Sequence, residues 1–201
     1  MIMSMTSSPR VAALIAELRD QRRSSFTIAR NCRVSDVVAA IKSNAAPDLL
    51  PAFAYILGER GAVTGLEPLV GLLQSASANL RSVAADAIGK ILFKTNRRSR
   101  ADEVIYPLID ALGKEPVPGV IADLLAALGA TRRPILSRRI APYLNSQHDV
   151  VRRGAADALG LINTPEARAI LAASPLARSD MRERLAKSRQ HLSRAKRKLH
   201  S

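Results

Sequence analysis

Apolar residues recur along most of this chain at the three- and four-residue spacing of an amphipathic helix. The first such stretch is 9–20, in which Val11, Leu14, Ile15 and Leu18 fall on one face. Residues 1–8 precede it and are polar, and we expect them to be disordered.

Three further helices are predicted before residue 60. Residues 26–33 are apolar but short, and Ser35 stands where it would cap a helix over 36–43. Pro47, a residue typical of helix starts, precedes a helix predicted over 49–59.

One stretch of small apolar residues, Asn79–Leu92, returns later in the chain as Asp149–Ile162. Similar helices reach a glycine at intervals of 31, 40 and 31 residues, and these glycines are Gly58, Gly89, Gly129 and Gly160. Glycine accepts the left-handed backbone that often ends a helix, so each is predicted to lie at a helix end. A two-helix unit repeated about every 31 residues predicts an all-α solenoid.

Two segments resemble HEAT repeats. In the first, 65–73 is followed by 80–89; in the second, 151–160 is followed by 163–171, which opens another unit. The pattern resembles the short HEAT repeats of bacterial HEAT-like proteins and phycobilin lyases. The resemblance covers roughly residues 35–173 and implies a HEAT-like α-solenoid of antiparallel helix pairs, with the second helix of each unit lining a concave face. We expect the whole helical-repeat domain to span residues 9–176.

The 40-residue interval departs from this pattern. Its additional residues are expected in a basic loop, 93–100. Its second helix also lacks the arginine that stands eight residues before the glycine at Arg81 and Arg152, because Ile121 occupies that position.

Composition supports helices and indicates an anionic partner. Hydrophobic residues make up 47% of the chain and aromatic residues only 3%, which favours closely packed helices over a β-sandwich. The net charge of +14 favours nucleic acid, a ribonucleoprotein, an acidic protein or an anionic membrane face. The alternative is that the surplus of arginine only aids solubility.

Residues 177–201 are predicted to form a basic amphipathic helix or tail. Met181, Leu185, Leu192 and Leu199 share one helix face, and residues 180–201 hold eight basic and two acidic side chains. Such a helix could dock on a partner, contact an anionic surface or bind phosphates, and the alternative is a solvated extension.

Basic clusters are the main candidate sites for nucleic acid or an acidic partner. Their residues are Lys94, Arg97, Arg98, Arg100, Arg132, Arg133, Arg138, Arg139, Arg153, Arg182, Arg184, Lys187, Arg189, Arg194, Lys196, Arg197 and Lys198. The chain has no Trp and only three Tyr and three Phe, so few aromatic rings are available to stack on bases. Binding would therefore be driven by phosphate contacts and weakened by salt.

Asp86 and Asp157 both stand three residues before a repeat glycine. The fold resembles HEAT-like alkylpurine DNA glycosylases, in which an aspartate in the concave cleft supports base excision, and this makes both residues candidate catalytic groups. The alternative is a structural ladder in which each aspartate pairs with Arg81, Arg152 or the backbone. Two helix spacings would separate them by ~20 Å, too far for a cooperating carboxylate pair.

Other chemistry is sparsely represented. Cys32 is the only cysteine and is expected to be a small buried hydrophobe, and the three histidines are scattered. We therefore expect no metal site and no cofactor. No signal peptide or membrane span is recognisable, which predicts a cytoplasmic protein; the oligomeric state is left open.

These patterns favour a non-catalytic scaffold whose basic surface binds an acidic partner, foremost nucleic acid or a ribonucleoprotein. The first alternative is a protein–protein adaptor that holds a peptide or helix in its groove. The second is an enzyme, either a DNA glycosylase or a lyase-like protein that handles a chromophore.

Overall fold

The computed structural model describes residues 8–20, 25–95 and 98–174. Within these ranges the chain forms helices and no strand, which confirms the prediction of an all-α protein. The disorder expected at 1–8 and the helix or tail expected at 177–201 concern residues that lie, but for Ser8, outside the described ranges.

Eleven α-helices and four short 3-10 helices make up the described part of the chain. In order they are α1 (Pro9–Arg19), α2 (Ser25–Asn31), α3 (Val34–Lys42), η1 (Pro47–Leu49), α4 (Leu50–Arg60), η2 (Val63–Gly65), α5 (Leu66–Leu72), α6 (Ala78–Thr95), α7 (Arg98–Lys114), α8 (Pro118–Ala130), η3 (Pro134–Leu136), α9 (Ser137–Ile140), η4 (Ala141–Asn145), α10 (Asp149–Ile162) and α11 (Pro165–Ala173).

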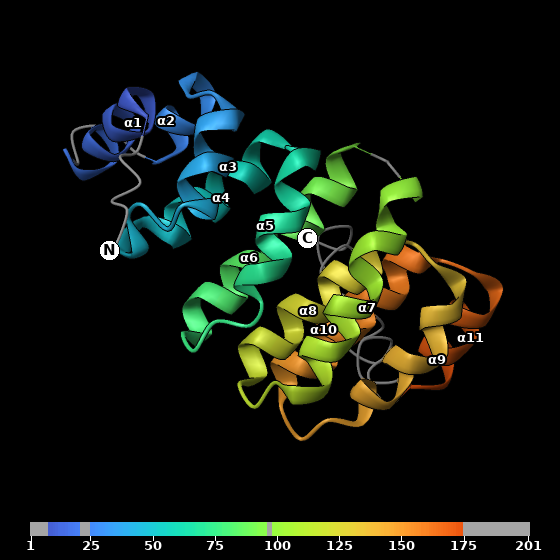
Figure 1. Cartoon of the computed structure of the whole chain (residues 1–201). Helices are drawn as coiled ribbons and strands as arrows, with labels where there is room; N and C mark the ends of the chain where they lie inside the picture. The colour runs from blue at the N-terminus through green and yellow to red at the C-terminus, as the bar shows by residue number, and fades with distance from the viewer. Residues whose placement is uncertain (1–7, 21–24, 96–97, 175–201) are drawn as a thin grey trace, which may run out of the picture.

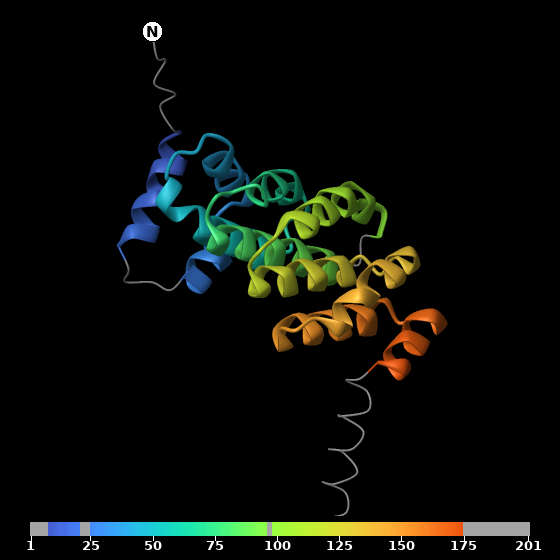
Figure 2. The ribbon, with the colours of Figure 1, turned by 90° about the horizontal axis from the view of Figure 1, so that it is seen from below.

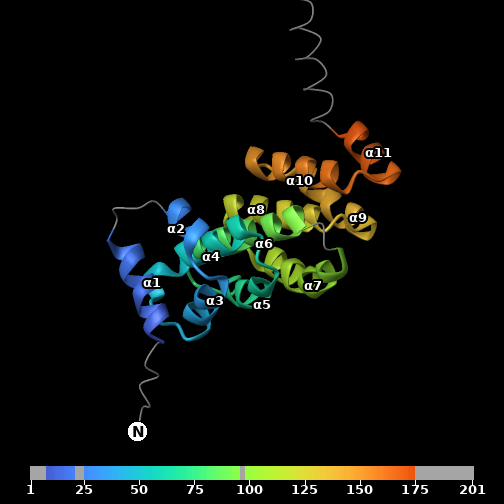
Figure 3. The ribbon, with the colours of Figure 1, turned by 90° about the horizontal axis from the view of Figure 1, so that it is seen from above.

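The helices lie in two layers (Figure 1). Helices α4, α6, α8 and α10 pack side by side in that order and each contains one repeat glycine, so we call them the glycine layer. Helices α1, α3, α5, α7, α9 and α11 form the covering layer, as the views from below and from above show (Figures 2 and 3). Large apolar side chains fill the core, among them the fully buried Phe53, Leu69, Ile88, Leu108 and Leu125.

Local sequence explains several helix boundaries. Ser8 and Thr164 cap α1 and α11 by accepting hydrogen bonds from backbone amides, and a proline follows each of them. The prediction that Ser35 caps α3 is wrong, because α3 begins at Val34. The extended backbone of Arg33 (φ −83°, ψ 129°) starts the helix before Ser35 without a side-chain cap.

Gly58, Gly129 and Gly160 lie within the last three residues of α4, α8 and α10, but none of the repeat glycines has a positive φ, so the prediction of a left-handed backbone there is wrong. Gly89 also departs from the predicted position. Helix α6 continues to Thr95, six residues beyond Gly89. The left-handed residues that do end helices come later, at Gly61 (φ 61°) after α4 and Asn163 (φ 51°) after α10.

The repeat glycines instead allow neighbouring helices to approach closely. A Cβ placed on Gly58 would lie 2.8 Å from Cα of Ala87, and one on Gly129 would lie 2.5 Å from Cα of Ala158. At Gly89 the equivalent distance, to Cα of Ala127, is 3.3 Å. In each case the neighbour is the alanine that stands two residues before the next of the four repeat glycines. The repeated Ala-X-Gly pattern is therefore a packing contact between successive helices.

The basic loop predicted at 93–100 is also wrong, because most of it is helical. Helix α6 extends to Thr95 and α7 already begins at Arg98. The additional residues lengthen α7 to 17 residues and bury Ala101 and Val104 in the core. Burial of apolar side chains on one face explains why this polar-looking stretch is helical. None of the described helices is long and apolar enough to cross a membrane.

Substituting Gly129 by alanine should destabilise the protein. The added methyl group cannot fit beside Ala158 unless α8 and α10 separate, and overpacking of this kind costs about 1–3 kcal/mol. Gly71→Ala is the matched control, because this exposed helical glycine has nothing within 4 Å of its added Cβ. The control should gain roughly 0.5–1 kcal/mol from better helix propensity. Urea unfolding of both variants measures the difference, and equal stabilities would refute the packing role.

Candidate functional site

A pocket of about 260 Å³ lies on the glycine layer. Its lining comes from α6, α8 and α10 and consists of Asp86, Gly89, Lys90, Phe93, Lys94, Asp123, Ala126, Ala127, Ala130 and Leu161. The small residues needed for close helix packing leave this hollow, and its floor is apolar. Charged side chains occupy its rim.

Lys90 connects two helices beside this pocket. Its Nζ lies 2.8 Å from Oε1 of Glu59 on α4 and 3.0 Å from Oδ2 of Asp86 on α6. The same ammonium lies 5.3 Å from the ring centroid of Tyr55, within cation–π range. Burial opposes the charge on Lys90, but the hydrogen bonds to Glu59 and Asp86 outweigh it and raise its pKa. Hydrogen bonds from Lys90 and Lys94 lower the pKa of Glu59.

Asp123 is the pocket carboxylate that the sequence reasoning missed. Burial raises its pKa, and the charge of Asp86 raises it further. Ser82 on α6 donates a hydrogen bond to Oδ2 of Asp123 over 2.5 Å. The sequence comparison considered only the position three before each glycine, which is Ala126 in α8. Asp123 stands one helical turn before Ala126 on the same face of α8. This three-residue spacing is the feature of the sequence that could have identified it.

The structure separates the two aspartates singled out in the sequence. Asp86 lines the pocket and is bound to Lys90, whereas Asp157 is exposed on α10 and does not line the pocket. The alternative that Arg81 and Arg152 pair with these aspartates is wrong. Arg81 pairs with Glu115, and Arg152 pairs with Asp149.

Arg81 holds together three segments of backbone. Its Nε and NH2 donate to the two carboxylate oxygens of Glu115 over 2.6 and 2.8 Å, and NH1 donates to the carbonyls of Ser75 and Ala76. Glu115 also accepts the backbone amide of Val117, and its side chain is only 2% exposed. Arg81 in α6 thereby fixes the loops that precede α6 and α8.

Arg152 repeats part of this arrangement in α10. Its NH1 donates to the carbonyls of Ser146 and Gln147 in the loop before the helix. NH2 turns back to Asp149 within the same helix instead of reaching another loop. The arginine eight residues before the glycine is therefore a structural residue in both helices.

Lys94, which the sequence predicted as a binding residue, donates hydrogen bonds to carbonyl groups at the C-terminal end of the neighbouring helix α4. Its Nζ donates to the carbonyl of Glu59 over 2.8 Å and reaches that of Gly58 at 3.4 Å. Arg60 does the same one helix earlier, with the carbonyls of Ala29 and Arg30 at the end of α2. Cations at these positions satisfy unpaired carbonyls and complement the helix dipole.

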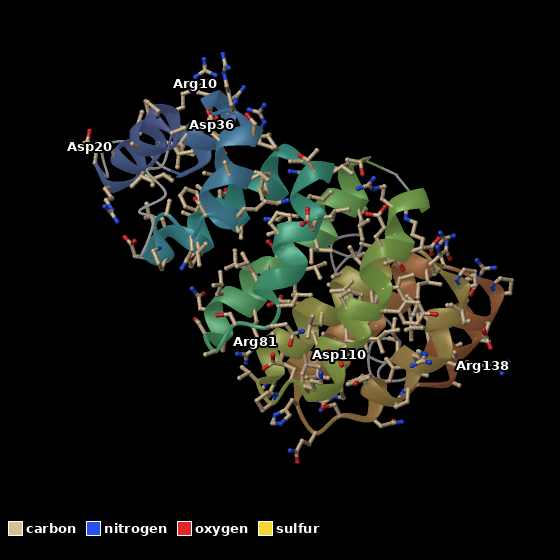
Figure 4. The ribbon with its side chains drawn as sticks, viewed as in Figure 1. Arg10, Asp20, Asp36, Arg81, Asp110 and Arg138 are labelled. Atoms are coloured by element: carbon tan, nitrogen blue, oxygen red, sulfur yellow. The ribbon has the colours of Figure 1, made fainter. Side chains whose placement is uncertain are left out.

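Most other predicted basic residues in the described ranges are also engaged. The pairs are Arg100 with Glu103, Arg133 with Asp102, Arg138 with Glu166 and Arg153 with Asp149. The guanidinium of Arg132 lies 5.8 Å from the ring centroid of Phe93 at the end of the pocket. Within the described part of the chain, Arg139 is exposed and forms no ion pair. The clusters at 94–100 and 132–139 lie against each other, because Arg132 contacts Phe93 and Arg133 pairs with Asp102, but most of their cations are already engaged. Charged residues also lie at opposite ends of the molecule, as Arg10 and Arg138 show in Figure 4.

The positive charge is unevenly distributed along the chain. The described residues contain 19 Lys and Arg against 15 Asp and Glu, whereas residues 175–201 contain nine against two. The helical layers thus hold a surplus of only +4, and the C-terminal segment holds +7 of the total +14. Arg97, the side chain of Arg98 and the eight predicted residues from Arg182 to Lys198 lie outside what the structure describes.

Within the described residues no group of three or more His, Cys, Asp or Glu could hold a metal ion. Cys32 is half-buried, and burial raises the pKa of its thiol, which disfavours the reactive thiolate. Comparison with known protein families finds no match, and no curated protein is similar in sequence. The functional argument therefore rests on the geometry and charge described above.

Replacing Arg81 by methionine should cost about 3 kcal/mol, because it leaves the carboxylate of Glu115 buried without its partner. Arg152→Met is the control and should cost less, since the carboxylate of Asp149 is half-exposed. The pKa of Glu115 is lowered chiefly by its hydrogen bond to Arg81. The stabilisation that ionised Glu115 gives the folded state is therefore present above the ordinary glutamate pKa. It is lost as the pH falls through the lowered pKa that Glu115 has in the folded state. Urea unfolding at pH 7 and pH 3 measures both effects, and an Arg81→Met penalty unchanged at pH 3 would contradict the assignment.

Asp123 should make the protein less stable as the pH rises. The pKa of Asp123 in the folded state lies above the ordinary aspartate value, so the folded state binds this proton more tightly than the unfolded state does. The stabilisation that results is present at low pH and is lost as the pH rises from about 4 through the folded pKa. Asp123→Asn removes this titration while an amide oxygen still accepts the bond from Ser82. The stability of the variant relative to the natural chain should therefore increase from pH 4 to pH 7. Asp157→Asn, at an exposed position, is the control, and parallel pH profiles for both variants would contradict the prediction.

Proposed function

We propose that this protein is a non-catalytic binding scaffold in which a HEAT-like solenoid carries a basic C-terminal segment to a polyanion, foremost nucleic acid or a ribonucleoprotein. The uneven charge distribution is the observation that supports this proposal best. The cations of the helical layers mostly serve internal contacts, whereas residues 175–201 concentrate nine basic side chains against two acidic ones.

The solenoid part of the proposal is supported by the stepwise packing of the glycine layer. Gly58, Gly89 and Gly129 each receive an alanine from the following helix, and within the layer the helices contact their immediate neighbours. Arrays of this kind grow in one direction and offer long surfaces to partners. Their stability does not depend on a single closed core, so a charged segment can be added at one end.

Phosphate contacts account for the expected partner. A segment with nine cations can neutralise several phosphates and release their counterions, which gives affinity without sequence specificity. Base stacking would contribute little, because the one exposed aromatic ring of the pocket, Phe93, already faces Arg132. We therefore expect binding that tolerates many sequences and weakens with salt.

The pocket favours a second candidate function, an adaptor that holds a peptide. Its apolar floor and the carboxylates of Asp86 and Asp123 fit an apolar side chain followed by a basic one. The glycosylase alternative has less support. Asp86 is bound to Lys90, and Asp157 lies outside the pocket.

Salt dependence tests the leading proposal on the full chain. Four substitutions in the C-terminal segment, Arg194→Gln, Lys196→Gln, Arg197→Gln and Lys198→Gln, should weaken binding to random duplex DNA. The slope of log K against log salt should fall by about 0.9 for each phosphate contact that is lost. A control variant with Arg100→Gln, Lys114→Gln, Arg138→Gln and Arg153→Gln removes the same charge from ion-paired positions and should retain most of the affinity.

Fluorescence anisotropy between low and moderate salt measures both slopes. No binding, or an affinity that salt does not change, would refute the polyanion proposal and favour the adaptor. Equal losses in the two variants would refute the role of the C-terminal segment, because net charge alone would then explain binding.

A further inference from the structure

The last helix of the glycine layer has an open edge. Gly58 and Gly129 are buried against the next helix, but Gly160 in α10 is exposed, and a Cβ placed on it meets nothing within 4 Å. The contact that every earlier repeat glycine makes is therefore missing at Gly160 within the described part of the chain.

A second position on the same edge is open as well. Four residues before the glycine, Ala54, Ala85 and Leu125 are fully buried in α4, α6 and α8. The equivalent Ala156 in α10 is only half-buried. Two independent positions thus identify the same face of α10 as one that the layer elsewhere covers.

The order of elements indicates what could cover this face. A helix of the covering layer precedes each of the last three helices of the glycine layer: α5 precedes α6, α7 precedes α8, and α9 precedes α10. Helix α11 belongs to the covering layer, and its Ile170 and Leu171 remain half-exposed. After Ser174 the chain continues for 27 residues, enough for a connection and a helix as long as α10, which needs about 21 Å.

The sequence of that continuation repeats the pattern of the glycine layer. Met181-Arg182 corresponds to Leu80-Arg81 in α6 and to Val151-Arg152 in α10. In this alignment Leu185 and Leu192 fall on positions that are buried in both helices, held in α6 by Ala84 and Ile91.

The small residue that fills a glycine position is also present. Ser188 corresponds to Ala87, the residue that packs against Gly58. Two positions depart from the pattern: Arg189 takes the place of the buried Ile88 and Leu159, and Gln190 takes the place of the repeat glycine.

We propose that residues 180–193 dock on the open edge of α10 as a fifth helix of the glycine layer, with Ser188 against Gly160. Docking buries Met181, Leu185 and Leu192, the apolar stripe of the segment. The segment is positively charged, and the exposed carboxylate of Asp157 on α10 complements it. This inference does not depend on what the basic residues bind.

Docking would also give the basic residues a defined direction. Lys187 takes the position of Asp86 and Asp157, three residues before the glycine, and therefore joins the face of the layer that carries the pocket. Arg194 and the basic residues after it would extend beyond the end of this helix. The binding surface would then be built on the array and would not be a separate tail.

Disulfide trapping in the full chain tests the docking. In a Cys32→Ser background, the pair Arg153→Cys and Arg184→Cys should form an intramolecular disulfide under mild oxidation. In the proposed alignment this pair is equivalent to Ser82 on α6 and Asp123 on α8, whose side chains touch, and it leaves the close contact at Gly160 unchanged. The control pair, Gly71→Cys with Arg184→Cys, uses an exposed glycine on α5 with nothing within 4 Å. The docked pair should react at least about ten times faster than the control.

Adding Leu185→Asp to the first pair should slow its reaction to the control rate, because a buried charge opposes docking. Circular dichroism checks that every variant remains helical. Equal rates for the two pairs would overturn the proposal, and so would covalent dimers, which would mean that the segment docks on a second copy. Because no nucleic acid is used, this result is independent of the salt test of function.

Discussion

Close approach of helices through glycine and alanine is the constraint on which the rest of the structure depends. At Gly58, Gly89 and Gly129 the neighbouring helix comes so near that an added Cβ would lie 2.5–3.3 Å from its backbone. Only the smallest side chains fit between backbones at that separation, and interiors packed this tightly tolerate little added volume. The large residues, such as Phe53 and Ile88, point instead toward the core that both layers share. The same small residues leave the apolar hollow on the glycine layer.

Tight packing also brings the ends of neighbouring helices within reach of long basic side chains. Lys94 and Arg60 reach the carbonyls at the ends of α4 and α2, and Arg81 reaches a carboxylate in the loop before α8. Unpaired carbonyls at helix ends and a buried carboxylate both need donors, and these residues provide them. Much of the basic content of the helical layers is thus structural. This explains why charge counted along the chain overstates what the layers can offer a partner, and why the proposed polyanion contact moves to the C-terminal segment.

Electrostatics around the pocket follow from the same geometry. Glu59 and Asp86 form ion pairs with Lys90 and keep its ammonium group charged. Asp123 is less exposed than Asp86, and among the described residues only the hydroxyl of Ser82 donates a hydrogen bond to its side chain. Two carboxylates in similar positions therefore differ in burial and in partners. The ion-paired Asp86 suits a structural part in the rim. Asp123 is the group in the pocket whose protonation a bound partner could change.

The sequence by itself determined the helical class, the repeat and the composition of the packed faces, because helical periodicity and the spacing of small residues are local properties of the chain. It also placed Asp86 on the face that carries the pocket. Tertiary structure decided how those residues are used. Gly89 allows two helices to approach closely instead of ending one, because its contact is with Ala127, a residue 38 positions away that no local pattern reveals. The stretch around Arg98 is helical because Ala101 and Val104 find a core to enter. Arg81 finds Glu115 and leaves Asp86 to Lys90, since partner choice depends on which loop folds against which helix.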